Sequence, residues 1–576
     1  MAERKIVKLP LIPYQYQPLS PAAQTRIIVL EPSLDASAPL VCGVEELQLV
    51  SDEGFQALSY TWGEPRLTET LVVNRVSLLR ITANLRDALR RFRLPFGPRR
   101  LWVDAICINQ GDEGEKARQI PFMDVIYRSA SAVLVWLGDY PTQAACLAYI
   151  RDYPRLLGQE RGPHSRLGRQ EHSELSMSIS SLVELPWFSR RWIVQEAVLN
   201  ADVLLCCCDR ELSWVRLAAC LGMIKNPAPR FKPFHTLLAM ASLWKRWVLD
   251  TDVVRDGGIF DLLEAFDHFQ CANDKDRLFA LGGLATDLSL GPNPSPGSLP
   301  LHVDYTITTE ALYTNFARDV LESGSVPMKH QMLISSINRC SDGQTSLPSW
   351  VPDWRVSAIR TPFFHYEVYN SLVRFEYNPP SLLLHGQEVR GPEVKVSGTY
   401  EALPARALSL SEINNWLRTM GKLWLDRYPN PGLSAYAKFI TECAHSSGLQ
   451  ISGDAVFSMI SWVMSADQLN ASGLNEHVYT LTDIGGLMQG RRVFCWSDPT
   501  EPSPPHIGIG PDHIQIGDEM IAAKRPSSGD HSFQVVLIAR YVAAASAKLI
   551  GDAVLVLSLD SANFWFPSPK RSIPLD

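Results

Sequence analysis

The sequence predicts an α/β protein with a mainly parallel sheet in its N-terminal part. Over the first ~215 residues, apolar runs alternate with helical patterns, which is typical of parallel strands joined by helices. Two of these runs are almost continuously apolar, as expected for strands that are buried on both faces. A mostly helical region follows, and the last hundred residues alternate short strands with turns, which predicts a small antiparallel β unit.

Five apolar runs are the candidate strands of the parallel sheet. Each is short, contains β-branched or aromatic residues and is flanked by polar or turn-forming residues. They are residues 27–30, 56–62, 101–108, 132–138 and 203–208. The third and fourth are the most apolar, so we expect them to be neighbouring central strands.

Helices are expected between these strands, at residues 82–93, 115–130 and 188–199. Pro121 interrupts the second of them. Proline inside a helix removes a hydrogen bond and clashes with the preceding turn, whereas it is tolerated at the first helical position. We therefore expect either a kink at Pro121 or a new helix that starts there.

The length of 576 residues exceeds what one hydrophobic core usually supports, so several domains are expected. Composition and periodicity divide the chain into regions 1–215, 216–330, 331–480 and 481–576. The second is helical, the third mixes helices with strands, and the fourth is rich in strands. We expect residues 382–400 to pair with the fourth region, with tight turns or bulges at Gly508, Gly510 and Gly517.

Composition limits the possible partners and compartments. The formal net charge of −7 argues against a broad electrostatic partnership with nucleic acid or anionic lipid. The first twenty residues lack the apolar core of a signal peptide, and no uncharged apolar run is long enough to span a membrane. Eleven scattered cysteines form no CxxC pair, and we interpret them as small buried side chains in a reducing compartment. A cytoplasmic protein is expected.

The segment PWFSRRWIVQEAVL, residues 186–199, is the most informative stretch. It places Trp192 and Glu196 four residues apart on one predicted helix face, where an indole and a carboxylate could hold a flat cationic ring. The alternative is structural: Trp192 belongs to the core and Glu196 pairs with a nearby arginine such as Arg190 or Arg191.

Polar and aromatic residues also collect where the predicted strands end, which is where doubly wound sheets bind ligands. Ser59, Tyr60, Trp62 and Gly63 close the strand 56–62. Asp104, Asn109 and Gln110 lie in or directly after the run 101–108. These residues are therefore candidates for ligand binding together with Trp192.

Each of these candidates has a plainer interpretation. Asp104 could be a buried carboxylate satisfied by backbone amides or by an arginine such as Arg191. Asn109 could shape the turn that leaves its strand, and Asp112 with Glu115 fits a capping box that opens the next helix. Cys107 has no histidine near it in sequence, so we interpret it as a core residue. The chain contains no P-loop, HExxH or GxSxG motif, and we expect no metal site.

Four blocks resemble those of the fungal heterokaryon-incompatibility (HET) domain family. They are ALSYTWGEP (57–65), RRLWVDAICINQGDEGEK (99–116), FMDVIYRSASAVLVWLGD (122–139) and PWFSRRWIVQEAVL (186–199). Their order and spacing also fit the family. The resemblance is strong over residues 14–208 and weaker beyond, where CANDKDRLFALGGLA (271–285) and LPSWVPDWR (347–355) resemble segments of long HET proteins.

HET domains are in turn similar to Toll/interleukin receptor (TIR) domains, which have a flavodoxin-like fold and several of which cleave the nicotinamide–ribose bond of NAD. In those enzymes the catalytic glutamate follows a tryptophan by four residues. This resemblance implies Glu196 as the catalytic carboxylate, stabilising the positive charge that develops on the ribose. It implies NAD as a substrate and no required cofactor. Trp62 or Trp192 would supply a flat surface for a ring of the substrate.

Two functional hypotheses follow from the resemblance. In the first, the chain is an effector of heterokaryon incompatibility and programmed cell death that cleaves NAD. In the second, it is a non-catalytic module that signals by self-association through the HET domain or by binding an incompatibility partner protein. A biosynthetic accessory role for the same fold is a third, weaker hypothesis.

Overall fold

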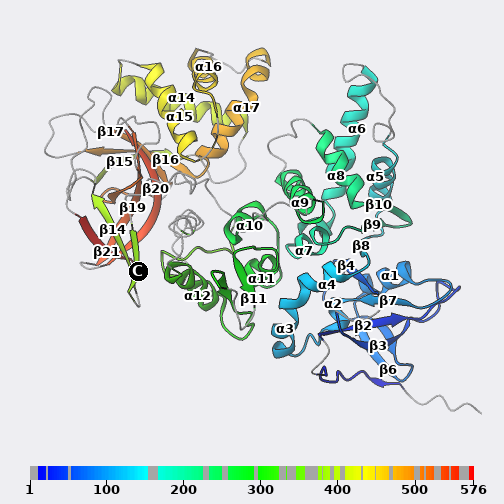
Figure 1. Cartoon of the computed structure of the whole chain (residues 1–576). Coiled ribbons are helices and arrows are strands. Elements are labelled where there is room, and N and C mark those ends of the chain that lie inside the picture. The colour runs from blue at the N-terminus through cyan, green and yellow to red at the C-terminus, as the bar shows by residue number, and fades with distance from the viewer. Residues whose placement is uncertain are drawn as a thin grey trace, which may run out of the picture. The chain divides into compact units, whose positions relative to one another are not determined.

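The computed structural model divides into two compact units, residues 1–307 and 308–576 (Figure 1). The structure describes residues 11–20, 24–49, 54–153, 166–224, 232–249, 257–290, 296–323, 333, 346–356, 374–378, 381–388, 395–402, 409–429, 432–447, 449, 451–465, 471–497, 506–511, 514–524, 533–543, 546–556 and 570–575. Each unit is described separately below.

Four parallel strands form the centre of the large sheet in the first unit. In spatial order they are β7 (Arg99–Trp102), β4 (Gln56–Tyr60), β8 (Val133–Gly138) and β9 (Val203–Cys207). Numbered along the chain, these four strands have the spatial order 2-1-3-4. This is the flavodoxin-like order of a doubly wound sheet, so the predicted fold class is confirmed.

The sheet continues beyond β7 with strands that the sequence reading only partly anticipated. The strand β2 (Thr25–Leu30) pairs with β7 in antiparallel fashion, which makes the ten-stranded sheet mixed. Beyond β2 lie β3 (Val41–Leu47), β5 (Glu69–Val73), β6 (Ser77–Ile81) and the two-residue β1 (Ile12–Pro13). At the opposite edge, β10 (Arg210–Ser213) forms a hairpin with β9.

Two predictions about the central strands are wrong. The run 101–108 is not one strand, because β7 ends at Trp102 and the helical turn α2 (Asp104–Cys107) follows. The strands β7 and β8 are not neighbours, because β4 lies between them and pairs with both. An apolar run alone cannot distinguish a buried strand from a buried helical turn. Asp104, which favours the first turn of a helix, was the signal against a continuous strand.

The predicted helices are present, with one clear interruption. The helix α1 (Ala83–Phe92) is capped by the Thr82 hydroxyl, which accepts a hydrogen bond from the Leu85 N–H. The expected helix 115–130 is divided into α3 (Glu113–Gln119), the 3-10 turn η1 (Ile120–Phe122) and α4 (Met123–Ser129). Pro121 lies in the first turn of η1, where the missing N–H has no helical partner to lose.

The region after β8 supplies helices that contact β9 and β10. They are α5 (Pro141–Arg151) and α8 (Trp214–Met223). The stretch predicted as one helix at 188–199 is instead the 3-10 turn η3 (Pro186–Ser189) followed by the short α7 (Ile193–Val198). The other elements of this unit are α6 (Arg166–Val183), α9 (Lys232–Val248), α10 (Ile259–Ala265), α11 (Asp276–Gly282), β11 (Leu288–Leu290) and β12 (Leu299–Leu301).

The second unit combines helices with a nine-stranded, almost entirely antiparallel sheet. Its helices are α12 (Thr309–Glu322), α14 (Leu410–Arg427), α15 (Leu433–Ser446), α16 (Gly453–Ser465) and α17 (Ala471–Met488). Its strands are β13 (Arg374–Asn378), β14 (Ser381–Glu388), β15 (Lys395–Ala402), β16 (Arg491–Ser497), β17 (His506–Pro511), β18 (Glu519–Lys524), β19 (Phe533–Ala543), β20 (Ser546–Val556) and β21 (Lys570–Leu575).

The expected pairing of residues 382–400 with the C-terminal strands is confirmed. The strand β14 pairs with β21 and β18, and β15 pairs with β16. Gly517 has a φ of 95° in the turn before β18, as predicted. Gly508 and Gly510 instead lie in the regular register of β17 with β16, so the expectation of a turn or bulge there is wrong. No helix in the described part of the chain is both long and apolar enough to cross a membrane.

Candidate functional site

Glu196, the residue predicted to be catalytic, lies on α7 and is almost completely buried, with an exposed fraction of 2%. Its carboxylate faces the guanidinium of Arg190, at 3.3 Å from Oε1 to Nη2 and 3.4 Å from Oε2 to Nη1. The Arg190 side chain is 20% exposed. The structural alternative of a glutamate paired with a nearby arginine therefore describes this arrangement. A catalytic carboxylate has to be reached by the substrate, and in this conformation Glu196 is buried and paired with Arg190.

A third donor reaches Glu196 from the end of β4. The Ser59 hydroxyl donates to Glu196 Oε2, and the Trp187 indole N–H donates to the same hydroxyl oxygen at 2.7 Å. Ser59 and Trp187 are both buried. The chain Trp187–Ser59–Glu196 thus connects η3, β4 and α7. Ser59 was predicted as a binding residue, whereas nothing in the spacing indicated Trp187, which lies in the first turn of the same sequence block.

Asp104 forms the second carboxylate of the cluster. It accepts the indole N–H of Trp62 at 2.8 Å and its own neighbouring backbone N–H, that of Ala105, at 2.7 Å. Trp62 is 40% exposed and follows β4, so Asp104 fixes an indole that solvent and ligands can reach. The plainer interpretation, in which backbone amides satisfy the Asp104 carboxylate, is confirmed for the Ala105 N–H. The arginine that interacts with it is Arg190, however, and not Arg191.

The electrostatics of the cluster centre on Arg190, which interacts with both Glu196 and Asp104. Burial raises the pKa of the Glu196 and Asp104 carboxyls, although Arg190 opposes that shift in both. Burial alone would lower the pKa of Arg190, but the two carboxylates together raise it. Burial and Asp104 raise the pKa of Tyr60, which is also hydrogen-bonded to Asp104. One arginine therefore interacts with two acidic side chains, Asp104 just after β7 and Glu196, which contacts Ser59 near the end of β4.

Trp192 does not join this cluster. Its indole N–H donates to Asp276 at 3.1 Å, while Glu196 binds Ser59 and Arg190. Trp192 is the residue that precedes α7, and the Glu196 N–H donates to its backbone carbonyl at 3.3 Å. The spacing of four residues is thus real, but the two side chains have separate partners.

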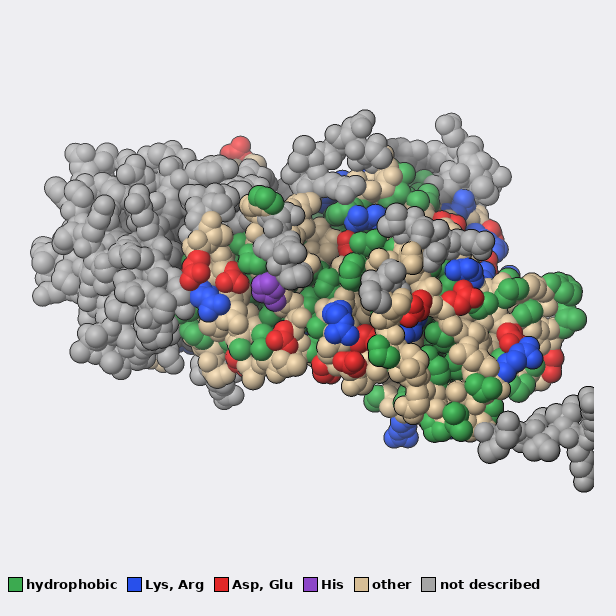
Figure 2. Space-filling view, turned by 60° about the horizontal axis from the view of Figure 1, so that its bottom comes forward, with side chains coloured by type: hydrophobic (Ala, Val, Ile, Leu, Met, Phe, Trp, Pro, Cys, Tyr) green, Lys and Arg blue, Asp and Glu red, His purple; other side chains and the backbone are tan. Residues whose placement is uncertain are grey.

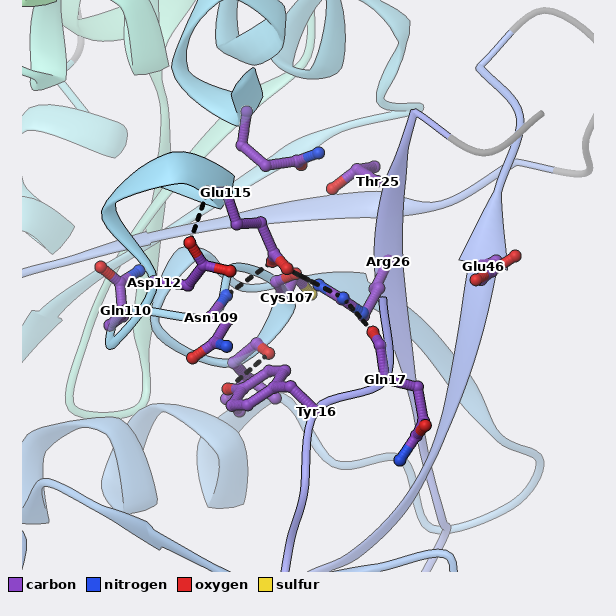
Figure 3. Close-up of polar contacts among 12 residues, drawn as sticks. Tyr16, Gln17, Thr25, Arg26, Glu46, Cys107, Asn109, Gln110, Asp112 and Glu115 are labelled. Atoms are coloured by element: carbon purple, nitrogen blue, oxygen red, sulfur yellow. Dashed lines mark hydrogen bonds and ion pairs between the residues drawn. The ribbon is translucent and has the colours of Figure 1, made fainter. Parts of the chain in front are cut away.

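Asn109 and Gln110 belong to a different polar group, which surrounds a buried ion pair (Figure 3). In this pair Arg26 Nη1 lies 2.6 Å from Glu115 Oε1, and both side chains are at most 5% exposed. The Asn109 backbone N–H donates to Glu115 Oε1 at 2.8 Å, and the Asn109 side-chain oxygen accepts the Gly111 N–H at 3.3 Å. Asn109 therefore shapes the turn after α2, as its plainer interpretation states.

The same group corrects the capping-box interpretation. The Asp112 carboxylate accepts the Glu115 N–H at 3.0 Å and caps α3, as expected. The Glu115 carboxylate does not return a bond to Asp112, because it accepts from Arg26 and Asn109 instead. Gln110 donates to the backbone carbonyl of Asp104 at 2.9 Å, which ties this group to the Asp104 cluster.

Two further candidates have structural roles in this conformation. Burial raises the pKa of the Cys107 thiol to about 12, although the Val103 N–H, which donates to the sulfur at 3.2 Å, opposes that shift. A thiol with so high a pKa is a poor nucleophile. Gly63 has a φ of 72° directly after Trp62, a conformation that favours glycine. No group of three or more His, Cys, Asp or Glu residues that could hold a metal ion occurs in the described ranges.

Comparison with known proteins gives a family match to this region and one similar relative. Residues 55–196 match the family model "Heterokaryon incompatibility protein (HET)". The chain is also similar to "Heterokaryon incompatibility protein 6, OR allele" of Neurospora crassa, with 27% identity over 409 residues. This similarity covers 59% of the present chain and 59% of the relative. No solved structure matches the chain.

Proposed function

Because residues 55–196 form a heterokaryon incompatibility domain, we propose that this chain acts in heterokaryon incompatibility in the fungal cytoplasm. The observation that carries the proposal is the coincidence of the matched block with the parallel strands β4, β7 and β8 and the cluster at their carboxyl ends. The similarity to the Neurospora protein over 59% of its length supports the same role. Deleting the gene from one of two strains that form an inviable heterokaryon should restore growth of the fused cells.

We further propose that the domain acts by cleaving NAD, with Glu196 as the catalytic carboxylate. Nicotinamide would leave as a neutral molecule, because the electron pair of the broken bond to ribose C1′ returns to the pyridinium ring. Water would bond to C1′ and release its proton to solvent or to a carboxylate. Glu196 would stabilise the cationic ribose at the carboxyl end of β4, where such sheets bind ligands.

The closed arrangement of Glu196 requires one preceding step. Arg190 must move away, because a paired carboxylate has little field left for a developing cation. The Arg190–Glu196 contacts of 3.3 and 3.4 Å are longer than the 2.6 Å of the Arg26–Glu115 pair. Arg190 is also partly exposed, so a ligand or a second copy of the chain can reach it. Self-association through the domain is the trigger that we propose.

Purified wild-type chain should release nicotinamide from NAD at high protein concentration, and Glu196→Gln should reduce the rate by at least about 100-fold. The matched control is Glu115→Gln, which removes the charge of the other buried, arginine-paired glutamate but lies outside the Glu196 cluster. It should keep the rate per folded molecule. Equal loss in both variants would show that activity follows folding and not Glu196.

The alternative function is non-catalytic signalling through a partner. The burial of Glu196 and its three donors favour this alternative, because they are what a structural carboxylate requires. Absence of nicotinamide release under crowded or cross-linked conditions, with incompatibility still abolished by deletion of the gene, would establish it. In that case Glu196→Gln should weaken incompatibility only as far as it lowers the melting temperature.

A further inference from the structure

The helix α7, which ends the matched block, is held by a segment far downstream of it. Residues 266–290 and Tyr305 lie outside the match to residues 55–196 but contact η3, α7, α3 and α4. Most of these contacts are hydrogen bonds, so they fix the position of α7 and do not merely pack against it. Together they make residues 266–290 and Tyr305 part of the surroundings of α7.

The first contact is between backbones. The Gln270 N–H donates to the Ser189 carbonyl at 2.7 Å, and the Gln270 carbonyl accepts the Arg191 N–H at 2.8 Å. These two bonds form an isolated parallel bridge around Arg190. Arg191 is buried, and its guanidinium donates to the Phe266 carbonyl at 2.8 Å. The chain on both sides of Arg190 is thereby fixed to the downstream segment.

The second contact centres on Asp276, the first residue of α11. Its carboxylate accepts the Trp192 indole N–H at 3.1 Å and the Tyr305 hydroxyl at 2.6 Å. The Tyr305 ring lies under the ammonium group of Lys116 on α3, at 4.9 Å from the ring centroid. Asp276 therefore joins α7 and α11 directly, and through Tyr305 it joins both to α3.

The third contact is steric. At the end of α11, a Cβ on Gly283 would lie 2.7 Å from Asp124 Cβ on α4 and 3.1 Å from Gln195 Nε2 on α7. Only glycine allows this approach, since real Cβ atoms do not come so close. The α11 helix is thus seated against α4 and α7 at one end, while Asp276 binds Trp192 at the other.

We propose that residues 266–290, together with Tyr305, act as a clamp that keeps α7 in its closed position, with Asp276 as the positioning residue. Ser189 and Arg191 flank Arg190 and both bind Gln270, so the clamp holds the Arg190–Glu196 pair closed. Releasing Asp276 from Trp192 frees the segment 190–198 to move. This inference extends the proposed function, in which Arg190 must leave Glu196, but the clamp itself needs no catalysis.

Hydrogen–deuterium exchange of the full chain tests the clamp without NAD. Asp276→Ala should accelerate exchange of the amides in residues 190–198 by roughly tenfold or more, the effect of losing a hydrogen bond to a charged group. Exchange in β4 and β8 should stay within about twofold of wild type, because their ladders are not part of the clamp. Tyr305→Phe removes one hydroxyl and should give a smaller acceleration at the same amides.

Asp304→Ala is the matched control, because this carboxylate lies next to Tyr305 but accepts from the Thr306 N–H and hydroxyl. It should leave exchange at residues 190–198 unchanged. The clamp is refuted if Asp276→Ala leaves these amides unaffected, or if it accelerates β4 and β8 equally through global destabilisation. Faster nicotinamide release by Asp276→Ala would support both proposals. Local acceleration without release by any variant would keep the clamp and reject cleavage.

Discussion

Two buried glutamates in the same unit show how differently one residue type can be held. Glu115 has a short ion pair with Arg26 and accepts the Asn109 N–H, and both charged side chains are buried. Glu196 has a longer pair with Arg190, which it shares with Asp104. Removing either glutamate leaves an arginine without its partner, and loss of one member of a buried pair costs about 3–5 kcal/mol. The difference in geometry is why we assign movement to Arg190 and not to Arg26.

The raised pKa of Glu196 has a measurable sign. A carboxyl that binds its proton more tightly in the folded state stabilises the protein below its unfolded pKa, and this stability is lost as the pH rises through the folded pKa. The free energy of unfolding of wild type should therefore fall, relative to Glu196→Gln, as the pH rises from about 4. Urea unfolding at a series of pH values measures this difference.

Glu46 provides a control of opposite sign. Hydrogen bonds from the Ser20 hydroxyl and backbone N–H lower the pKa of Glu46. The free energy of unfolding of wild type, relative to Glu46→Gln, should therefore be highest above the unfolded pKa of this group and should decrease as the pH falls through the folded pKa. Parallel curves for wild type and Glu196→Gln would contradict the shift at Glu196.

Sequence reasoning located these residues better than it described their partners. The spacing placed Trp192 and Glu196 on one predicted helix at 188–199, of which the structure keeps only α7, directly after Trp192. The structural alternative named Arg190 among the arginines that could pair with Glu196. It could not indicate that Asp276, eighty residues after Glu196 (276 − 196), would bind the Trp192 indole. Nor could it link Trp187 to Ser59, because such pairings depend on how distant segments meet and no local periodicity records them.

At the scale of elements, the predictable features were those with a local cause. Thr82 begins α1 through its hydroxyl, and Pro121 divides α3 from α4, as their side-chain chemistry requires. The continuous apolar run 101–108 was misread because burial favours apolar residues in strands and in helical turns alike. The sequence did not predict that β7 lies beside β4. The order of strands in a sheet depends on the topology of the whole chain, and the apolar content of each strand does not determine it.

The β9–β10 hairpin contains a strained residue that allows a test of stability. Its two loop residues are Cys208 and Asp209, and Cys208 has a φ of 51°, which glycine adopts without the steric cost of a Cβ. Cys208→Gly should raise the free energy of unfolding by about 0.5–1 kcal/mol, the relief of left-handed strain less the entropy of glycine. Thermal or urea unfolding measures the change.

Cys206 serves as the control, because it lies in the interior of β9 and is fully buried. Cys206→Gly should destabilise the protein by about 1 kcal/mol or more, through lost packing and added chain entropy. A loss of stability in Cys208→Gly similar to that of Cys206→Gly would show that the thiol of Cys208 contributes more than its backbone strain costs.

At the scale of the whole molecule, basic and acidic side chains of the described residues are interspersed on the face that Figure 2 shows. They do not separate there into areas of a single sign. The chain as a whole carries a formal net charge of −7. We expect no appreciable binding to double-stranded DNA at about 0.15 M salt, because there is no excess of cations to release condensed counterions. Electrophoretic mobility shift with micromolar protein would test this, and a strongly salt-dependent shift would contradict it.

The separation of Asp276 from α7 along the chain also has a consequence during synthesis. Translation at about 5–20 residues per second adds the eighty residues between Glu196 and Asp276 in roughly 4–16 s. For that interval the nascent chain carries α7 without its downstream contacts, so the domain emerges from the ribosome before the segment that holds α7 has been synthesised. A chaperone that binds exposed apolar segments would meet this intermediate in every molecule made.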